Sequence, residues 1–151
     1  MTDRYAVIGN PVDHSKSPII HAEFARQTGQ DIEYGRLLAP LEGFRDTVEA
    51  FRRAGGKGLN VTLPFKLEAF QLATLRSVRA GDAQAVNVLS FEDDGIAGDN
   101  TDGVGLVRDI EANLGFPIAG KRILLLGAGG AAQGAVGPLL AMYPAILAVG
   151  N

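Results

Sequence analysis

Four polar clusters in this sequence follow apolar, strand-like segments, and their side chains could recognise a small molecule. They are His14-Ser15-Lys16-Ser17-Pro18, Asn60-Val61-Thr62-Leu63-Pro64-Phe65-Lys66, Ala85-Val86-Asn87 and Asn100-Thr101-Asp102-Gly103. In an open α/β sheet, ligands bind outside the carboxyl ends of the strands, so the clusters could meet in one crevice. Hydroxyls, amides, an amine and a carboxylate suit a polyhydroxylated, anionic small molecule.

A glycine-rich turn near the C-terminus matches a dinucleotide-binding pattern. The apolar segment 121–126 leads into Gly127-Ala128-Gly129-Gly130-Ala131-Ala132, which fits G-x-G-x-x-G/A with Ala132 in the last place. Gly127 would make the tight turn, and Gly129 would let the backbone approach a pyrophosphate that faces the amides of the next helix. We therefore predict that residues 127–132 bind a dinucleotide, with a strand–helix turn that binds nothing as the alternative.

The end of the second strand of this unit, at 145–149, bears on which nicotinamide cofactor binds. In such units an Asp or Glu holds the free 2′-hydroxyl of NAD, whereas a nearby Arg accommodates the 2′-phosphate of NADP. Asn151 lies near that place, and residues 140–151 contain no carboxylate. The sequence therefore favours NADP and adds Asn151 to the predicted cofactor site. Because it ends there, we expect the chain to hold only the first unit of a cofactor domain.

Alternating strands and helices must position these residues. Strands are predicted near 5–8, 32–38, 58–61, 85–91 and 96–98, and helices over 17–29, 41–55, 64–69 and 101–114. Ser17 before Pro18 is typical of an N-cap followed by proline in the first turn. The pattern predicts an α/β fold with a mainly parallel sheet covered by helices on both faces, followed by an incomplete Rossmann-type unit. Pro138 falls inside the predicted cofactor helix, which should be short or kinked.

Composition restricts the classes of function. A hydrophobic share of 46%, a charged share of 21% and a net charge of −3 describe a soluble globular protein without a basic surface for nucleic acid. No apolar run approaches the ~20 residues that span a bilayer and no signal peptide is present, so we expect no membrane partner and a cytoplasmic location. The absence of cysteine, with two histidines only, argues against a metal site. No role is assigned to His14 or His21. The sequence is compatible with a homodimer and does not decide the oligomeric state.

The polar clusters, in this order and followed by Gly-Ala-Gly-Gly-Ala-Ala, resemble the shikimate dehydrogenase family. Ser-x-Ser-Pro, Asn-Val-Thr-x-Pro-Phe-Lys and Asn-Thr-Asp-Gly carry the resemblance, which covers nearly the whole chain. It implies NADP-dependent, reversible reduction of 3-dehydroshikimate to shikimate in aromatic amino-acid biosynthesis. It also implies that Ser15 and Ser17 bind the substrate carboxylate. By the same resemblance, the residues around the ring hydroxyls are Asn60, Thr62, Lys66, Asn87 and Asp102.

Lys66 and Asp102 form the catalytic pair that the resemblance implies, and their chemistry agrees with it. Reduction of a ketone by hydride requires a proton for the developing alkoxide, and the reverse oxidation requires a base. A lysine amine can supply and recover that proton, while a neighbouring carboxylate orients the amine and binds a substrate hydroxyl. The alternative is a solvated lysine in the first turn of a helix and a helix-capping aspartate.

The resemblance also predicts a division of the chain into three parts. Residues 1–101 would form the substrate-binding domain, 102–117 a linking helix, and 118–151 the start of an NADP-binding Rossmann domain. Two other functions remain open. One is a non-catalytic fragment that binds substrate, because half a cofactor sheet would not hold the dinucleotide. The other is a quinate or shikimate dehydrogenase that prefers NAD.

Overall fold

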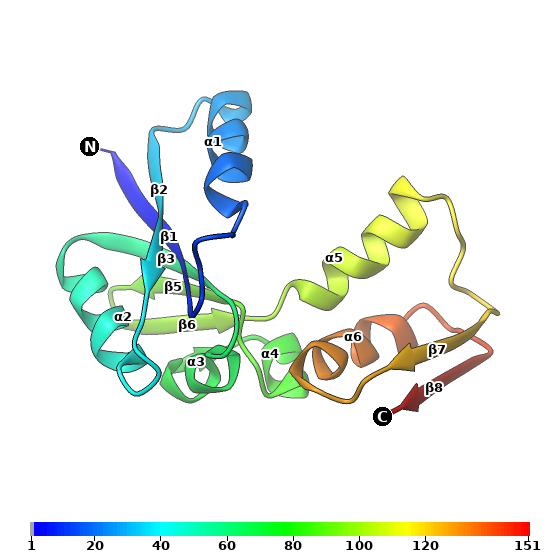
Figure 1. The fold of residues 1–151 in the computed structure, drawn as a ribbon. Coiled ribbons are helices and arrows are strands. Elements are labelled where there is room, and N and C mark those ends of the chain that lie inside the picture. The colour runs from blue at the N-terminus through cyan, green and yellow to red at the C-terminus, as the bar shows by residue number, and fades with distance from the viewer. Residues whose placement is uncertain (1) are drawn as a thin grey trace.

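Six strands form the main sheet of the computed structural model, which describes residues 2–151 (Figure 1). They are β1 (Asp3–Gly9), β2 (Ile32–Leu38), β3 (Gly56–Val61), β4 (Leu75–Arg76), β5 (Val88–Glu92) and β6 (Gly95–Asp99). Their order across the sheet is β2-β1-β3-β5-β6-β4. Only β5 runs against its two neighbours, β3 and β6, whereas the other pairs are parallel. This arrangement confirms the predicted, mainly parallel sheet.

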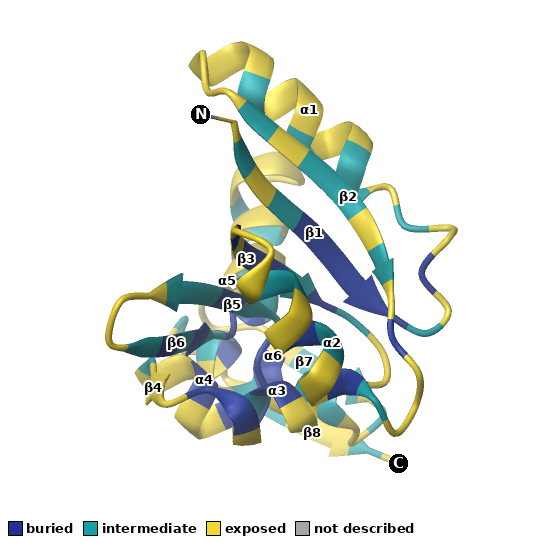
Figure 2. Ribbon diagram, turned by 90° about the vertical axis from the view of Figure 1, so that its left-hand side faces the viewer, coloured by how far each residue is buried: buried dark blue, intermediate teal, exposed yellow. Residues whose placement is uncertain are grey.

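Helices cover both faces of this sheet. They are α1 (Ser17–Thr28), α2 (Phe44–Arg53), α3 (Lys66–Leu72) and α4 (Val78–Ala83). Side chains alternate between the two faces along β1. Ala6 and Ile8 pack with α2 and α3, whereas Val7 lines a cavity that α1 also lines. Figure 2 shows that the second half of β1 is buried and that α1 lies beside β2. The helices on both faces are therefore as predicted.

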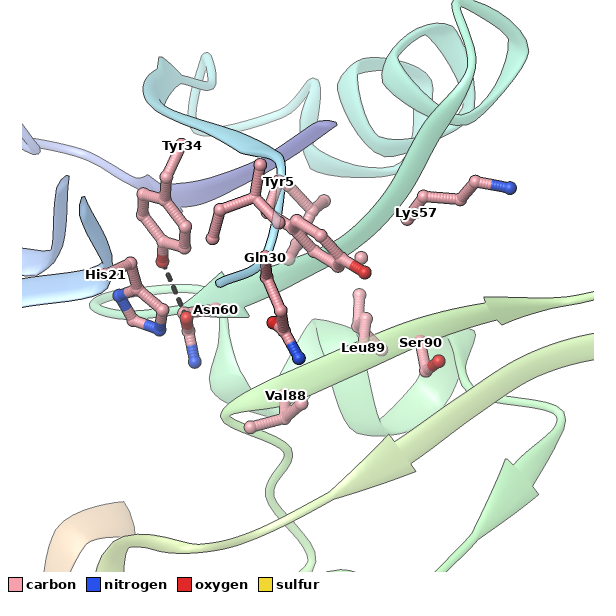
Figure 3. Close-up of a pocket in the computed structure, with 12 residues that line it drawn as sticks. Tyr5, His21, Gln30, Tyr34, Lys57, Asn60, Val88, Leu89 and Ser90 are labelled. Atoms are coloured by element: carbon pink, nitrogen blue, oxygen red, sulfur yellow. Dashed lines mark hydrogen bonds between the residues drawn. The ribbon is translucent and has the colours of Figure 1, made fainter. Parts of the chain in front are cut away.

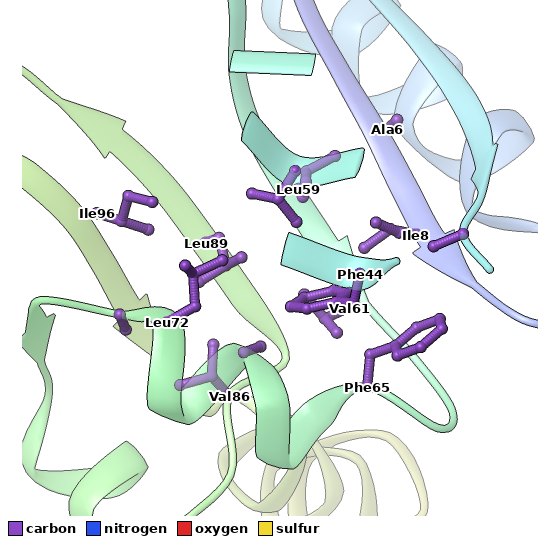
Figure 4. Close-up of a cluster of buried hydrophobic side chains, with 14 of the residues drawn as sticks. Ala6, Ile8, Phe44, Leu59, Val61, Phe65, Leu72, Val86, Leu89 and Ile96 are labelled. Atoms are coloured by element: carbon purple, nitrogen blue, oxygen red, sulfur yellow. The ribbon is translucent and has the colours of Figure 1, made fainter. Parts of the chain in front are cut away.

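The main hydrophobic core lies between the sheet and helices α2 and α3 (Figure 4). The rings of Phe44 and Phe65 stack with their centroids 4.9 Å apart, and both side chains are buried. Aromatic stacking of this kind adds to the free energy gained from burying the rings. Because Phe65 immediately precedes Lys66, this packing anchors the start of α3, where one of the predicted catalytic side chains is attached.

Two local predictions were wrong or incomplete. Lys16, not Ser17, is the N-cap of α1, and no side chain caps that end. Ser17 already has helical backbone, and its N–H donates instead to the Ser15 hydroxyl over 3.3 Å. Strand β4 and helix α4 were not predicted from the sequence. Helix α4 begins at a typical cap, because the Ser77 hydroxyl accepts the N–H of Ala80 over 3.1 Å.

The C-terminal part forms the strand–helix–strand unit that the glycine turn predicted. It comprises α5 (Asp102–Arg108), the π-helical segment η1 (Asp109–Asn113), β7 (Arg122–Leu126), α6 (Gly130–Leu140) and β8 (Ile146–Gly150). Strands β7 and β8 pair in parallel from Arg122↔Ile146 to Leu126↔Gly150. Helix α6 continues through Pro138. None of the helices formed by residues 2–151 has the length and apolar character needed to cross a bilayer.

A second, smaller core joins α6 to the strands and to α5. Its buried members are Ile118, Ala135 and Leu139, with Ile123 and Leu147 packed against them. The outward face of the two strands is different, because Leu124 and Leu126 are 64% and 80% exposed. One face of this small sheet is therefore covered and the other is an apolar surface.

Helices α5 and α6 approach closely at a pair of glycines. A Cβ on Gly103 would collide with the carbonyl oxygen of Gly134 and lie 2.7 Å from Cγ of Pro138. We expect Gly103→Ala to lower the free energy of unfolding by roughly 1–3 kcal/mol, because the two helices must separate to admit the methyl group. Urea denaturation checks this value.

Gly105→Ala is the matched control, because Gly105 lies on the same helix and a Cβ there would meet no atom within 4 Å. Alanine in an open helical position should stabilise the chain by roughly 0.5–1 kcal/mol. Equal effects of the two substitutions on stability would contradict the close approach of α5 and α6.

Candidate functional site

A cavity of about 290 Å³ opens beside the carboxyl ends of β1 and β3, next to the start of α1. All seven predicted substrate-binding residues line it: Ser15, Ser17, Asn60, Thr62, Lys66, Asn87 and Asp102. They come from four separate parts of the sequence. The fold therefore brings the four polar clusters into one crevice, and His14 and His21 contribute to the same wall.

Lys66 and Asp102 are in direct contact. The Nζ atom of Lys66 lies 2.6 Å from Oδ2 of Asp102, and the two side chains are 21% and 37% exposed. The other carboxylate oxygen, Oδ1, accepts a hydrogen bond from Nδ2 of Asn87 over 2.7 Å. Asp102 is thus held from two sides, and it presents the lysine amine to a cavity that a substrate can enter. Such a pair can hold a proton and deliver it to a substrate oxygen.

Three local features hold the pair in place. Lys66 is the first residue of α3, and its carbonyl accepts the N–H of Val86 over 2.9 Å, which ties α3 to the segment that carries Asn87. Asp102 is the first residue of α5. Asn87 also accepts the N–H of Thr101 over 2.9 Å through Oδ1. The two helix starts and the Asn87 loop are therefore linked by hydrogen bonds.

Asn100 holds the backbone of Asp102 through a hydrogen bond, a role that was not predicted from the sequence. Its side chain is buried, donates to the carbonyl of Ala85 over 3.1 Å and accepts the N–H of Asp102 over 3.2 Å. An amide without these partners would be costly to bury. Its position two residues before the predicted catalytic aspartate was the available sequence signal.

The serine loop is held by Arg36 on β2, a residue that the sequence analysis did not single out. The Nε and Nη2 atoms of Arg36 donate to the carbonyl of Ser15 over 3.1 and 2.5 Å. The Ser15 hydroxyl donates to that of Ser17 over 3.1 Å. The loop therefore presents two adjacent hydroxyls to the cavity, and both can donate hydrogen bonds to a carboxylate.

Asp99 anchors the end of β6, just before Asn100 and Asp102. Its carboxylate accepts hydrogen bonds from Arg79, from the hydroxyl of Ser77 and from the N–H of Asn100. The Arg79 guanidinium, above all, holds the pKa of the Asp99 carboxyl below its ordinary value. The ionised form of Asp99 is therefore the one that fits this structure.

We expect Asp99→Asn to lower the free energy of unfolding at neutral pH by roughly 1 kcal/mol, because the Arg79–Asp99 pair is partly exposed and screened by solvent. The folded-state pKa lies below the unfolded value of about 3.9, so this stabilisation is present above that pH and is lost as the pH falls through the folded-state pKa. Urea denaturation at a series of pH values should show the two proteins converging in acid. A difference in the free energy of unfolding that persists in acid would contradict the role assigned to Asp99. Asp94→Asn is the control, because Asp94 lies in an exposed turn.

The glycine turn leaves open space around its backbone. Gly127 has a φ of +103°, which a side chain would strain, and a Cβ on Gly127, Gly129 or Gly130 would meet no atom within 4 Å. The N–H of Gly127 donates to the carbonyl of Gly150 over 2.7 Å, so the turn lies beside Asn151 at the carboxyl ends of β7 and β8. The open space and the helix N-terminus fit the pyrophosphate of a dinucleotide. Gly127 and Asn151 therefore lie at the same edge of this small sheet.

The helix that begins at this turn packs on the loop that carries Asp102. A Cβ on Gly134 of α6 would lie 3.1 Å from Nδ2 of Asn100. The glycine turn is thus attached to the polar cavity through one helix and one buried asparagine. Within residues 2–151, no group of three or more His, Cys, Asp or Glu side chains is arranged to hold a metal ion.

Comparisons with known proteins agree on one family. Residues 7–89 match the family model described as the shikimate dehydrogenase substrate binding domain. The chain is 66% identical over 149 residues to the shikimate dehydrogenase (NADP(+)) of Aromatoleum aromaticum, covering 99% of this chain and 53% of that protein. It is 64% identical to the enzyme of the same name from Nitrosomonas europaea, covering 99% of this chain and 54% of the relative. The chain spans about half the length of these curated relatives.

Solved structures give the same result. An Ael1 enzyme from Pseudomonas putida has a TM-score of 0.94 and 53% identity, covering 98% of this chain and 55% of its own. Shikimate 5-dehydrogenase from Thermus thermophilus, solved in complex with NADP(H) and shikimate, has a TM-score of 0.89 and 33% identity, covering 98% of this chain and 56% of its own. By its sequence motifs, its fold and the match to the family model, this chain belongs to the shikimate dehydrogenase family.

Proposed function

We propose that this chain provides the substrate site and the first cofactor-binding unit of an NADP-dependent shikimate dehydrogenase, which interconverts 3-dehydroshikimate and shikimate. The observation that carries the proposal is the convergence of seven polar residues on one cavity, with Lys66 and Asp102 in contact inside it. The names of the relatives from Aromatoleum aromaticum and Nitrosomonas europaea support the same activity.

The proposed division follows the two sheets. Residues 1–101 form the substrate-binding domain, 102–117 link it to the next part, and 118–151 begin the NADP-binding domain. The boundary at 101–102 has support from the end of the six-stranded sheet at Asp99 and the start of α5 at Asp102. The apolar outer face of β7 and β8 is the kind of surface that a further layer of a doubly wound domain covers.

Each polar side chain has a proposed role toward shikimate. Ser15 and Ser17 bind the carboxylate, because their hydroxyls are adjacent and the loop is held by Arg36. Around the ring hydroxyls, the proposed contacts are Asn60, Thr62, Lys66, Asn87 and Asp102. Lys66 delivers a proton to the ketone oxygen during reduction and recovers it during oxidation, and Asp102 holds the amine in place.

The glycine turn and Asn151 are proposed to hold NADP, which supplies the hydride when bound. Gly127, Gly129 and Gly130 leave room for the backbone to approach the pyrophosphate, and Ala128, Ala131 and Ala132 complete the turn. Asn151 stands where a carboxylate would repel a 2′-phosphate, and this favours NADP over NAD. A dehydrogenase that prefers NAD would require a different group near the ribose.

Isothermal titration of the chain with shikimate tests the substrate site. We expect the double variant Ser15→Ala, Ser17→Ala to bind shikimate at least about tenfold more weakly than the wild type, because hydrogen bonds to a charged group contribute roughly 1.5–3 kcal/mol each. Ser90→Ala is the control, since Ser90 lies outside this cavity. Equal affinities of the wild type and the double variant would refute the role of the serines.

A further inference from the structure

Tyr34 connects two parts of the site that are distant in the sequence. Its hydroxyl donates to Oδ1 of Asn60 over 2.6 Å, as the dashed line in Figure 3 shows. Tyr34 lies on β2 and Asn60 on β3, with β1 between them, so the phenol reaches across one strand. In the sheet register, Tyr5 is paired with Tyr34 on one side and with Gly58 on the other. Asn60 follows Gly58 by two residues on the same strand, so it lies on the same face of the sheet as Tyr34.

This bond decides which end of the Asn60 amide is available to a ligand. An asparagine side chain has an oxygen that accepts and an NH₂ group that donates. Because Tyr34 occupies the oxygen, the remaining group is Nδ2, which points away from the phenol in Figure 3. Asn60 lines the substrate cavity, and no buried side-chain nitrogen or oxygen in residues 2–151 lacks a partner. The Nδ2 group is therefore an accessible hydrogen-bond donor at the boundary of two pockets that Asn60 lines, the substrate cavity and the neighbouring pocket of Figure 3.

Neighbouring groups hold the phenol in this position. The His21 ring stacks on Tyr34 with centroids 4.0 Å apart and an interplanar angle of 11°. Nδ1 of His21 lies 2.9 Å from the carbonyl oxygen of Ser17, and since a carbonyl only accepts, Nδ1 carries the proton. His21 thus ties the tyrosine to the first turn of α1, where the substrate-binding serine lies.

The tyrosine remains a donor at every pH at which the protein would be assayed. Burial disfavours the phenolate and raises the pKa of Tyr34 to about 12, although the nearby Ser17 hydroxyl opposes part of this shift. The phenol therefore keeps the proton that it donates to the amide oxygen of Asn60 in this structure.

We propose that Tyr34 is a positioning residue, which fixes the Asn60 amide with Nδ2 toward the cavity so that Asn60 donates a hydrogen bond to an oxygen of shikimate. The proposal rests on the proposed function, because it takes shikimate as the ligand. Tyr34 itself makes no contact with the substrate in this proposal. The effect of Tyr34 on binding must pass through Asn60, and this distinguishes Tyr34 from a residue that only stabilises the fold.

A double-mutant cycle on shikimate affinity, measured by isothermal titration, tests the proposal. The four proteins are the wild type, Tyr34→Phe, Asn60→Ala and the double variant. Phenylalanine keeps the ring that stacks on His21 and removes only the hydroxyl. We expect Tyr34→Phe to weaken shikimate binding about threefold to tenfold, which corresponds to one hydrogen bond of ordinary strength. In the Asn60→Ala background the same substitution should change the affinity by less than about twofold, because the amide it orients is gone.

Tyr5→Phe is the matched control, since Tyr5 is the neighbour of Tyr34 in the sheet and lies outside the substrate cavity. It should leave shikimate affinity unchanged. Unaltered affinity in Tyr34→Phe would overturn the positioning role while leaving the proposed function intact. An equal loss in the presence and absence of Asn60 would overturn it as well, because the effect would then be structural. A wild type that does not bind shikimate would overturn the proposed function and this proposal together.

Discussion

Lys66→Ala is expected to lower kcat by about 10²–10⁴-fold with a much smaller change in KM, because proton transfer by a positioned side chain contributes that much to rate. The lysine amine lies 2.6 Å from Asp102 in a cavity lined by the other polar residues, and alanine leaves no group there to protonate the substrate oxygen. The measurement is steady-state oxidation of shikimate with NADP, in a protein where this chain is followed by a complete nucleotide-binding domain.

Lys57→Ala is the control for the loss of a lysine at a position away from the substrate cavity. Lys57 lies on β3, is exposed and lies outside the substrate cavity. Its removal should leave kcat and KM within about twofold of the wild type, as is usual for surface substitutions. Turnover of Lys66→Ala close to that of Lys57→Ala would disprove the catalytic assignment.

Asp102→Asn is expected to reduce kcat by about 10–10³-fold. Asparagine has nearly the same shape and can still accept the hydrogen bond from Asn87, but it removes the negative charge that faces the Lys66 amine. With its one oxygen toward Asn87, asparagine turns an NH₂ group toward the Lys66 amine, which then loses both its acceptor and the opposite charge that orient it. The same steady-state assay measures the effect, and circular dichroism verifies that the fold is retained.

Asp109→Asn provides the matching carboxylate control, because Asp109 is exposed in the segment that continues α5. It should leave turnover unchanged. If Asp102→Asn instead retained wild-type kcat and only lost stability, Asp102 would be a structural residue at the start of α5, and Lys66 would act without it.

Much of the fold could be predicted from the sequence because local patterns determine it. Apolar segments marked seven of the strands, and β5 and β6 were correctly predicted as separate strands. The glycine turn, with an apolar strand on each side, correctly predicted the unit formed by β7, α6 and β8. The elements that were missed, β4 and α4, are two and six residues long, too short to show a period.

The sequence by itself determined which residues could do chemistry and placed them next to strands. Three of the clusters follow β1, β3 and β6, whose carboxyl ends lie at one edge of the sheet, as expected of parallel strands. Asn87 was expected near a strand end but precedes β5, and it reaches the same edge because β5 runs in the opposite direction. Only the tertiary structure decided how these residues are held. The hydrogen bond between Tyr34 and Asn60 joins β2 to β3, which lie on opposite sides of β1. The side chain of Asn100 donates to the carbonyl of Ala85, which lies 15 residues earlier in the sequence. No local pattern encodes such contacts, because each depends on the distance and direction between elements that become neighbours only when the chain folds.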